Sequence, residues 1–255
     1  MTTFRLNGIL IALLFFMLWF PMGQYDFLIE HWMKVGTYAI PFLFIGMLSF
    51  KKDKLSIQDT TLVASVLLLA YVVHQYEEHW IDLLGNRYAF YDAINQLILV
   101  VLGATDSLVK PLTREAIFMI NTSLVWLLGF VAIWRSQTHL FPTLAMTGIV
   151  FVNAITHIVA GIFLQAYDPG LFTSIVIFLP ISIYFYKYIL NSKPQLKKEV
   201  IASIIWSVIA HVIMVGGMLL ANWFHLISEY VYFAALIFWS CVPAFLFNHN
   251  ETNSQ

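Results

Sequence analysis

Long, uninterrupted apolar stretches alternate with short polar segments along most of the chain. A transmembrane helix needs about 20 consecutive, mainly apolar residues. The pattern predicts eight such helices, of which the second is short. They cover residues 8–24, 36–50, 59–81, 115–134, 141–165, 171–189, 200–222 and 229–248. We therefore expect an all-α protein, a polytopic transmembrane helix bundle that forms a single membrane-embedded domain over residues 1–255.

A ninth apolar stretch, 88–104, carries Asp92, Asn95 and Gln96. Cytoplasmic loops are enriched in Lys and Arg, so the distribution of these residues can decide whether the stretch crosses. If it does not cross, one side of the membrane holds nine of them and the other holds four; if it does, the split is six to seven. The nine are Arg5, Lys51, Lys52, Lys54, Arg135, Lys187, Lys193, Lys197 and Lys198, and the four are Lys34, Arg87, Lys110 and Arg114. We predict that 88–104 is re-entrant or interfacial and that both termini are cytoplasmic, in the inner (plasma) membrane.

Composition supports a membrane protein and narrows the function. Hydrophobic residues make up 60% of the chain, charged residues 11%, and the mean hydropathy is +0.81, whereas soluble domains are about 25% charged. The net charge of −1 offers no basic patch for nucleic acid. The single cysteine, Cys241, excludes an intramolecular disulfide and a cysteine metal cluster. The partners we expect are the lipid bilayer and an apolar or lipid-like small molecule, and nothing indicates a protein partner.

The third predicted helix ends in the polar sequence YVVHQYEEHW, residues 71–80. On a helix, His74 shares a face with Glu77 and Glu78, three and four positions later, and Tyr71 lies one turn earlier on the same side. An ionisable residue at the bilayer centre costs roughly 2.5–3.5 kcal/mol on insertion scales, so this cluster needs partners or a function. The alternative is a helix end that simply meets water. We expect His79 to point away from the cluster.

The fifth predicted helix carries a second polar stripe at a similar depth. Asn153, His157 and Gly161 recur every four residues, which places them on one face. Such a face is expected to point into the bundle, and the glycine would allow another helix to approach closely. We predict that this helix lies beside the third and brings His157 to His74 and Glu78. An interhelical hydrogen bond without further function is the alternative.

Other polar residues are more readily explained by structure than by chemistry. Tyr167 and Asp168 precede Pro169 and Gly170, a combination typical of turns. A lone histidine within a helix, such as His211, is usually a packing or hydrogen-bonded residue. Near the end of the seventh predicted helix, a solvated face is the favoured interpretation of three further residues. These are Asn222, His225 and Glu229.

The motifs, taken in order, resemble the HXXEE family of bacterial integral membrane proteins. They are His74-Gln-Tyr-Glu77-Glu78, Asn153-x-x-x-His157, and Gly161 followed by Tyr167-x-Pro169-Gly170. The resemblance covers about residues 60–190. The resemblance implies a membrane enzyme, because members of the family are described as such on the basis of their polar motifs. It implies no particular substrate. Relatives often have an aromatic residue where this chain has His79, which leaves the role of His79 open.

The leading hypothesis is an intramembrane enzyme that acts on a lipid, isoprenoid or other apolar substrate at the outer leaflet. Glu77, Glu78, His74 and His157 are the candidate catalytic residues; Asn153, Tyr71, Tyr167 and Gly161 would bind substrate or support them. A divalent metal, Zn²⁺ or Fe²⁺, could be held by His74, Glu78 and His157. A hydrolase and an acid–base isomerase or cyclase are both open. The alternatives are a transporter or proton-coupled carrier that uses the same cluster, and a non-catalytic accessory protein.

Overall fold

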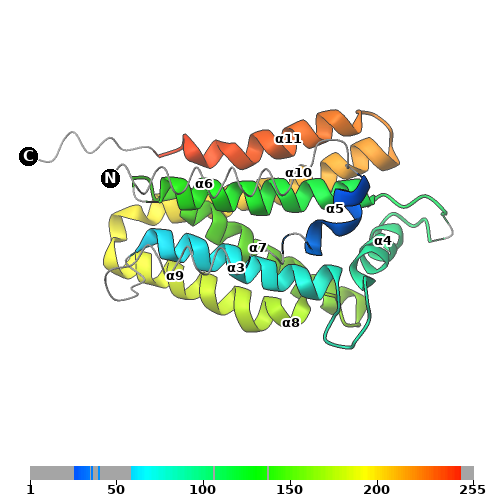
Figure 1. Cartoon of the computed structure of the whole chain (residues 1–255), viewed down its shortest axis with the longest axis horizontal. Coiled ribbons are helices and arrows are strands. Elements are labelled where there is room, and N and C mark those ends of the chain that lie inside the picture. The colour runs from blue at the N-terminus through cyan, green and yellow to red at the C-terminus, as the bar shows by residue number, and fades with distance from the viewer. Residues whose placement is uncertain are drawn as a thin grey trace, which may run out of the picture.

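The computed structural model describes residues 26–34, 36, 40, 59–105, 107–136 and 138–247. This part of the chain is helical and contains no strand beyond one isolated bridge between Ile81 and Arg87. Figure 1 shows the long helices running side by side as a bundle. The all-α prediction is therefore confirmed for these residues.

The helices follow one another through short connections, and several contain π-helical turns. In order, they are α3 (Thr60–His79), α4 (Ala89–Val101), α5 (Arg114–Ile120), η1 (Asn121–Leu127), α6 (Leu128–Arg135), α7 (Phe141–Leu164), α8 (Leu171–Thr173), η2 (Ser174–Phe178), α9 (Leu179–Ser192), η3 (Pro194–Leu196), α10 (Lys197–Met218), η4 (Leu219–Trp223), α11 (Glu229–Cys241) and η5 (Val242–Ala244).

Four helical stretches are long and apolar enough to cross a membrane: Arg114–Arg135, Phe141–Leu164, Leu171–Ser192 and Pro194–Trp223. The prediction of eight spanning helices is not supported. α3 has 20 residues but a strongly polar C-terminal end, and Glu229–Ala244 is a shorter apolar helix. The predicted helix 8–24 lies outside the described residues, as does 36–50 except for residues 36 and 40. Four long apolar helices nevertheless indicate a membrane protein.

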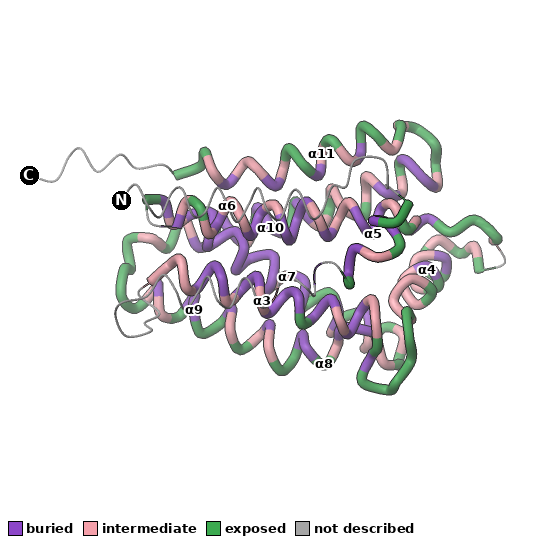
Figure 2. The backbone as a smooth tube through the Cα atoms, in the orientation of Figure 1, coloured by how far each residue is buried: buried purple, intermediate pink, exposed green. Residues whose placement is uncertain are grey.

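α7 lies at the centre of the bundle and packs against α3, α6, α9 and α10. Its N-terminal half is buried on all sides (Figure 2). Gly148 allows α10 to come close: a Cβ there would lie 2.7 Å from the carbonyl oxygen of Ser203 and would also collide with the Ser207 hydroxyl. Small residues at such contacts are typical of helix packing in membranes.

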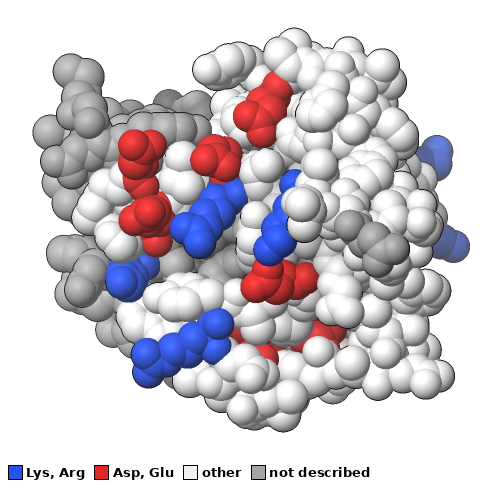
Figure 3. All heavy atoms as spheres, turned by 90° about the vertical axis from the view of Figure 1, so that its right-hand side faces the viewer, with Lys and Arg blue, Asp and Glu red and all other residues white. Residues whose placement is uncertain are grey.

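α4 lies crosswise at one end of the bundle, where α3 ends and α5 begins (Figure 1). With 13 residues it is one of the shorter apolar helices, and it lies within the predicted segment 88–104. The chain therefore enters α5 at the end where it left α3, and α6 runs back beside α3. Figure 3 shows that acidic and basic side chains gather on this end of the molecule. Among them, Lys110 and Asp92 form an exposed ion pair of 2.6 Å.

Candidate metal centre

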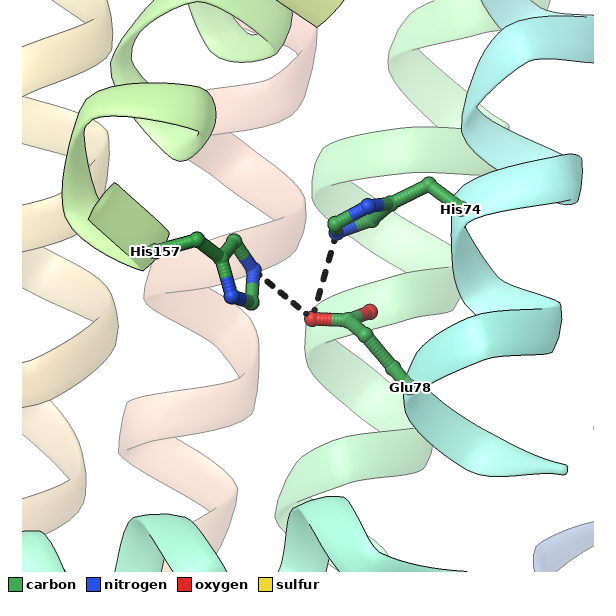
Figure 4. A group of neighbouring side chains, drawn as sticks. All are labelled: His74, Glu78 and His157. Atoms are coloured by element: carbon green, nitrogen blue, oxygen red, sulfur yellow. Dashed lines mark ion pairs between the residues drawn. The ribbon is translucent and has the colours of Figure 1, made fainter. Parts of the chain in front are cut away.

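His74, Glu78 and His157 converge near the end of the bundle that carries α4 (Figure 4). Glu78 Oε1 lies 3.3 Å from His74 Nε2, one turn earlier on α3, and 3.1 Å from His157 Nε2 on α7. All three side chains are buried. The predicted approach of α7 to this face of α3 is confirmed.

Each histidine is held through its other ring nitrogen. His157 Nδ1 lies 2.6 Å from Oδ2 of Asp168, in the turn after α7. His74 Nδ1 lies 2.7 Å from the hydroxyl of Thr173, at the end of α8. The Nε2 atoms of both rings therefore face the Glu78 carboxylate. Metal-binding histidines almost always have such a partner on the nitrogen that does not bind the metal.

The spacing of the three atoms suits a divalent metal ion. One ligand atom from each residue can be chosen so that all three lie within 4.8 Å of one another. Ligands about 2.0–2.1 Å from a tetrahedral ion lie roughly 3.4 Å apart, close to the 3.1 and 3.3 Å observed. Two imidazoles and one carboxylate form a common donor set for Zn²⁺ and Fe²⁺. The residues therefore fit a metal by donor chemistry, and the Glu78 oxygen lies at a ligand-like separation from each histidine nitrogen.

Glu77 points away from the two histidines. Its Oε1 accepts hydrogen bonds from the Tyr167 hydroxyl and from the Phe172 N–H (3.0 Å), and its Oε2 accepts from the Thr173 N–H (2.8 Å) and hydroxyl (2.5 Å). Partial burial and the charge of Glu77 raise the pKa of Tyr167, so that this hydroxyl keeps its proton. Glu77 thus fastens the turn and the start of the next helical stretch to α3.

Gly170 closes one side of the centre. Its φ of +102° is a conformation that favours glycine. A Cβ at this position would lie 2.7 Å from Cε1 of His74 and 2.7 Å from Cε1 of His157. The ring of Phe178 packs against His74 with a centroid separation of 4.3 Å. The backbone of the turn and an aromatic ring therefore shield the histidines.

The supporting residues predicted from the sequence surround the centre in different ways. Asn153 Nδ2 lies 3.0 Å from His74 Nε2, so Asn153 does form an interhelical hydrogen bond. Tyr71 contacts the His74 ring edge-on at 5.6 Å between centroids. A Cβ on Gly161 would lie 3.2 Å from the side chain of Leu171, so the glycine does allow the start of α8 to approach.

The expectation that His79 points away is wrong. Its Nε2 lies 3.4 Å from Oε2 of Glu78, and its ring contacts Trp32 and Phe90 with centroids 5.0 and 4.8 Å away. Asn121 lies beside the same nitrogen at 3.4 Å. Because α3 reaches its last turn here, the side chain can fold back toward the preceding carboxylate.

The remaining polar candidates lie outside the centre. His211 is hydrogen-bonded through Nδ1 to the Ser207 carbonyl oxygen of its own helix (2.8 Å), as expected for a packing residue. For Asn222, the prediction of a solvated face is wrong, because the side chain is buried and donates to the Pro111 carbonyl oxygen (2.9 Å). His225 is exposed and Glu229 is half-buried.

Sequence reasoning missed or undervalued three residues of the centre: Asp168, Thr173 and Gly170. Asp168 was explained by turn chemistry, yet its side chain is almost fully buried and bonds to His157. Thr173 carries no motif signal. A hint existed in the Tyr-x-Pro-Gly motif itself, because a tight turn directly after the His157 helix must return the chain near that histidine.

Comparison with known proteins supports the motif interpretation. Residues 65–185 match the family described as "Protein of unknown function with HXXEE motif", and the predicted resemblance is confirmed. His74, Glu77, Glu78 and His157 lie within the match. No curated protein and no solved structure matches the chain.

Proposed function

We propose that this protein is an intramembrane metal-dependent enzyme in which His74, Glu78 and His157 hold one divalent cation. The reaction class that fits best is hydrolysis of a lipid or other apolar substrate. A water molecule in the remaining coordination position would be the nucleophile.

The observation that carries the proposal is the meeting of three acceptor atoms. Asp168 accepts the proton of His157 Nδ1, so in the neutral ring Nε2 presents its lone pair to Glu78. His74 Nε2 accepts from Asn153, so it also lacks a proton. The His157 Nε2 lone pair and the Glu78 carboxylate then meet in a buried site, and a cation between them, either a proton on Nε2 or a metal ion, relieves their repulsion. A divalent metal is the cation that this donor set prefers.

Asn153 accommodates such an ion. Asn153 Nδ2 lies 3.0 Å from His74 Nε2 and donates to the lone pair of that nitrogen. A bound metal would take the same lone pair. The two ends of a side-chain amide have nearly the same shape, and one is a donor while the other is an acceptor. Rotation of the amide would therefore present Asn153 Oδ1 to the cation, so this residue need not leave the centre when the metal binds.

The chemistry follows from the residues. A bound Zn²⁺ lowers the pKa of a coordinated water to near 7 and polarises a carbonyl. Glu78 directs Oε1 toward the two metal-binding histidines, and its Oε2 lies 3.4 Å from Nε2 of His79, which would support the carboxylate in acid–base chemistry. The turn at Gly170 and the ring of Phe178 exclude bulk solvent. Fe²⁺ bound by the same three residues is the second candidate, because two histidines and one carboxylate are also typical of non-haem iron.

The position of the centre supports a membrane-embedded substrate. His157 lies seven residues before the end of α7 at Leu164, which is about 10 Å along the helix. Beside it, α7 exposes Val159, Ile162 and Phe163, an apolar surface suited to lipid. The charged end of the bundle would face water (Figure 3). A substrate with a polar bond just below the headgroups of the outer leaflet would reach this depth.

Metal analysis tests the proposal. The full chain, purified in detergent without chelators, should contain close to one equivalent of zinc or iron by inductively coupled plasma mass spectrometry. His74→Gln, Glu78→Gln and His157→Gln should each lose the metal. His211→Gln is the matched control, since the His211 ring bonds the Ser207 carbonyl oxygen of its own helix (2.8 Å), and it should retain the metal. Metal-free protein after growth in zinc- and iron-supplemented medium would overturn the proposal.

A further inference from the structure

We infer that Asp168 and Glu77 are positioning residues that orient the two metal-binding histidines, Asp168 directly and Glu77 through the hydroxyl of Thr173. This inference rests on the metal centre proposed above. It gives Glu77 a role different from that of a ligand or base, and it adds Asp168 and Thr173 to the functional residues. Each histidine then has its own carboxylate.

The first arm joins His157 to Asp168. Their atoms Nδ1 and Oδ2 are 2.6 Å apart, and the side chains are 5% and 1% exposed, so water does not compete for this bond. The carbonyl oxygen of Asp168 also accepts from the N–H of Leu171 at 2.9 Å, which fixes the turn. A buried carboxylate requires a donor. The proton is therefore held on Nδ1, and in the neutral ring Nε2 is left free for the metal.

The second arm joins His74 to Glu77 through Thr173. The Thr173 hydroxyl has one proton and lies 2.5 Å from Glu77 Oε2 and 3.3 Å from the Gly170 carbonyl oxygen. The shorter bond, to Glu77, takes the proton. The oxygen of the hydroxyl can then only accept from His74 Nδ1, at 2.7 Å. This ring is consequently fixed in the same tautomer as that of His157.

The chain provides both arms within a few residues. Asp168, Gly170 and Thr173 lie between the end of α7 and the start of η2, and Glu77 accepts two backbone N–H groups from the same segment. One short segment therefore orients both histidines and covers them. This explains why Glu77 and Glu78, although adjacent, have separate tasks.

A simpler explanation is that Glu77 only caps the helical stretch that begins at Leu171. The two explanations differ at the Thr173 hydroxyl. Thr173→Val removes the hydroxyl but keeps the backbone N–H that binds Glu77 Oε2, so the cap survives and only the arm to His74 is lost. Thr173→Ser keeps both. Thr147→Val is the matched control, because the buried Thr147 hydroxyl bonds only the Thr143 carbonyl oxygen of α7.

Zinc affinity of the full chain in detergent, measured by competition with a chromophoric chelator, tests the inference. Asp168→Asn and Thr173→Val should each weaken Zn²⁺ binding about 10- to 100-fold, as removal of such partners does elsewhere. Thr173→Ser and Thr147→Val should remain within about threefold of the unaltered chain. Substitution with Co²⁺ should show altered visible absorption in the first two variants only.

The outcomes separate the two proposals. Failure of the unaltered chain to bind Zn²⁺ would overturn the metal centre and, with it, the orienting arms. Tight binding that Asp168→Asn and Thr173→Val leave unchanged would overturn only the arms. Affinity is compared among proteins that melt cooperatively and elute as a single species. If Thr173→Val fails to melt cooperatively or to elute as a single species, Thr173→Ala replaces it. Asp168→Asn tests the other arm independently.

Discussion

Oε1 of Glu78 lies 3.1 Å from Nε2 of His157, although the two residues belong to different helices. His74 Nε2 approaches the same oxygen at 3.3 Å. With neutral His157 donating to Asp168 and His74 accepting from Asn153, no ring proton lies between either histidine and Glu78. The contact between Glu78 and His157 is therefore the geometric basis for a bound cation.

The adjacent glutamates are expected to respond differently to the same substitution. Glu78→Gln should abolish metal binding and activity but leave the melting temperature unchanged or higher, because removal of buried charge from a functional site often stabilises a fold. Glu77→Gln should lower the free energy of unfolding by about 2–3 kcal/mol, since hydrogen bonds to a charged acceptor contribute roughly 1.5–3 kcal/mol. Thermal melts and metal content of both variants provide the comparison. Equal effects of the two substitutions would contradict the separate roles.

Gly170 should be intolerant of even one additional carbon. Gly170→Ala places a Cβ 2.7 Å from both imidazoles at a φ of +102°, and the left-handed conformation alone costs roughly 1–2 kcal/mol for an L-residue. We expect a lower melting temperature and weaker metal binding. Gly216→Ala is the control, because a Cβ at Gly216 would meet no atom within 4 Å and alanine favours a helix interior by about 1 kcal/mol over glycine. A Gly170→Ala variant as stable and as metal-loaded as Gly216→Ala would contradict the close packing of the turn.

The hydrogen bond from Tyr167 to Glu77 should stabilise the fold over a wide pH range. Burial, and then the charge of Glu77, raise the pKa of Tyr167 in the folded state above its unfolded value of about 10. The contribution is therefore fully present below about pH 10 and lost only as the pH rises further. Tyr167→Phe should reduce stability by about 1 kcal/mol, and this deficit should be constant from pH 6 to 9 in denaturant titrations. A deficit that disappears near neutral pH would indicate that Tyr167 is ionised there.

The topology proposal can be checked independently of chemistry. Reporter fusions after Arg135 and Lys198 should indicate the cytoplasm, and a fusion after Lys110 should indicate the outside. The reason is that α4 lies at the end of the bundle where α3 ends and α5 begins, and the topology predicted from the sequence assigns nine Lys and Arg to the cytoplasmic side against four to the outer side. A cytoplasmic signal after Lys110 would invert the assignment of the metal centre to the outer leaflet.

Much of this arrangement could be predicted from the sequence. Hydrophobic patterning identified the helices, and the spacing of His74 and Glu78 placed them on one face. The cost of polar side chains in lipid then predicted that His157 would meet them. The predicted number of spanning helices is not supported. Apolar patterning also counted α3, which has a polar end, and the short helix at Glu229–Ala244, and neither is among the four long apolar helices.

The partners of the histidines could not be predicted in the same way. Thr173 and Asp168 reach the centre through a turn whose path depends on Gly170 having a positive φ, and helical periodicity does not extend through such a turn. His79 was misplaced because the last turn of a helix does not constrain a long side chain as the interior does. Local patterns therefore predicted the residues on helices and missed those on the connecting segment.

The most direct test of the proposed centre is anomalous diffraction from crystals of the full chain, recorded on both sides of the zinc and iron absorption edges. We expect one peak about 2.0–2.2 Å from Nε2 of His74, Oε1 of Glu78 and Nε2 of His157, and no such peak in the Glu78→Gln variant. A map with no anomalous peak at these three atoms, from protein supplied with both metals, would contradict the proposed centre.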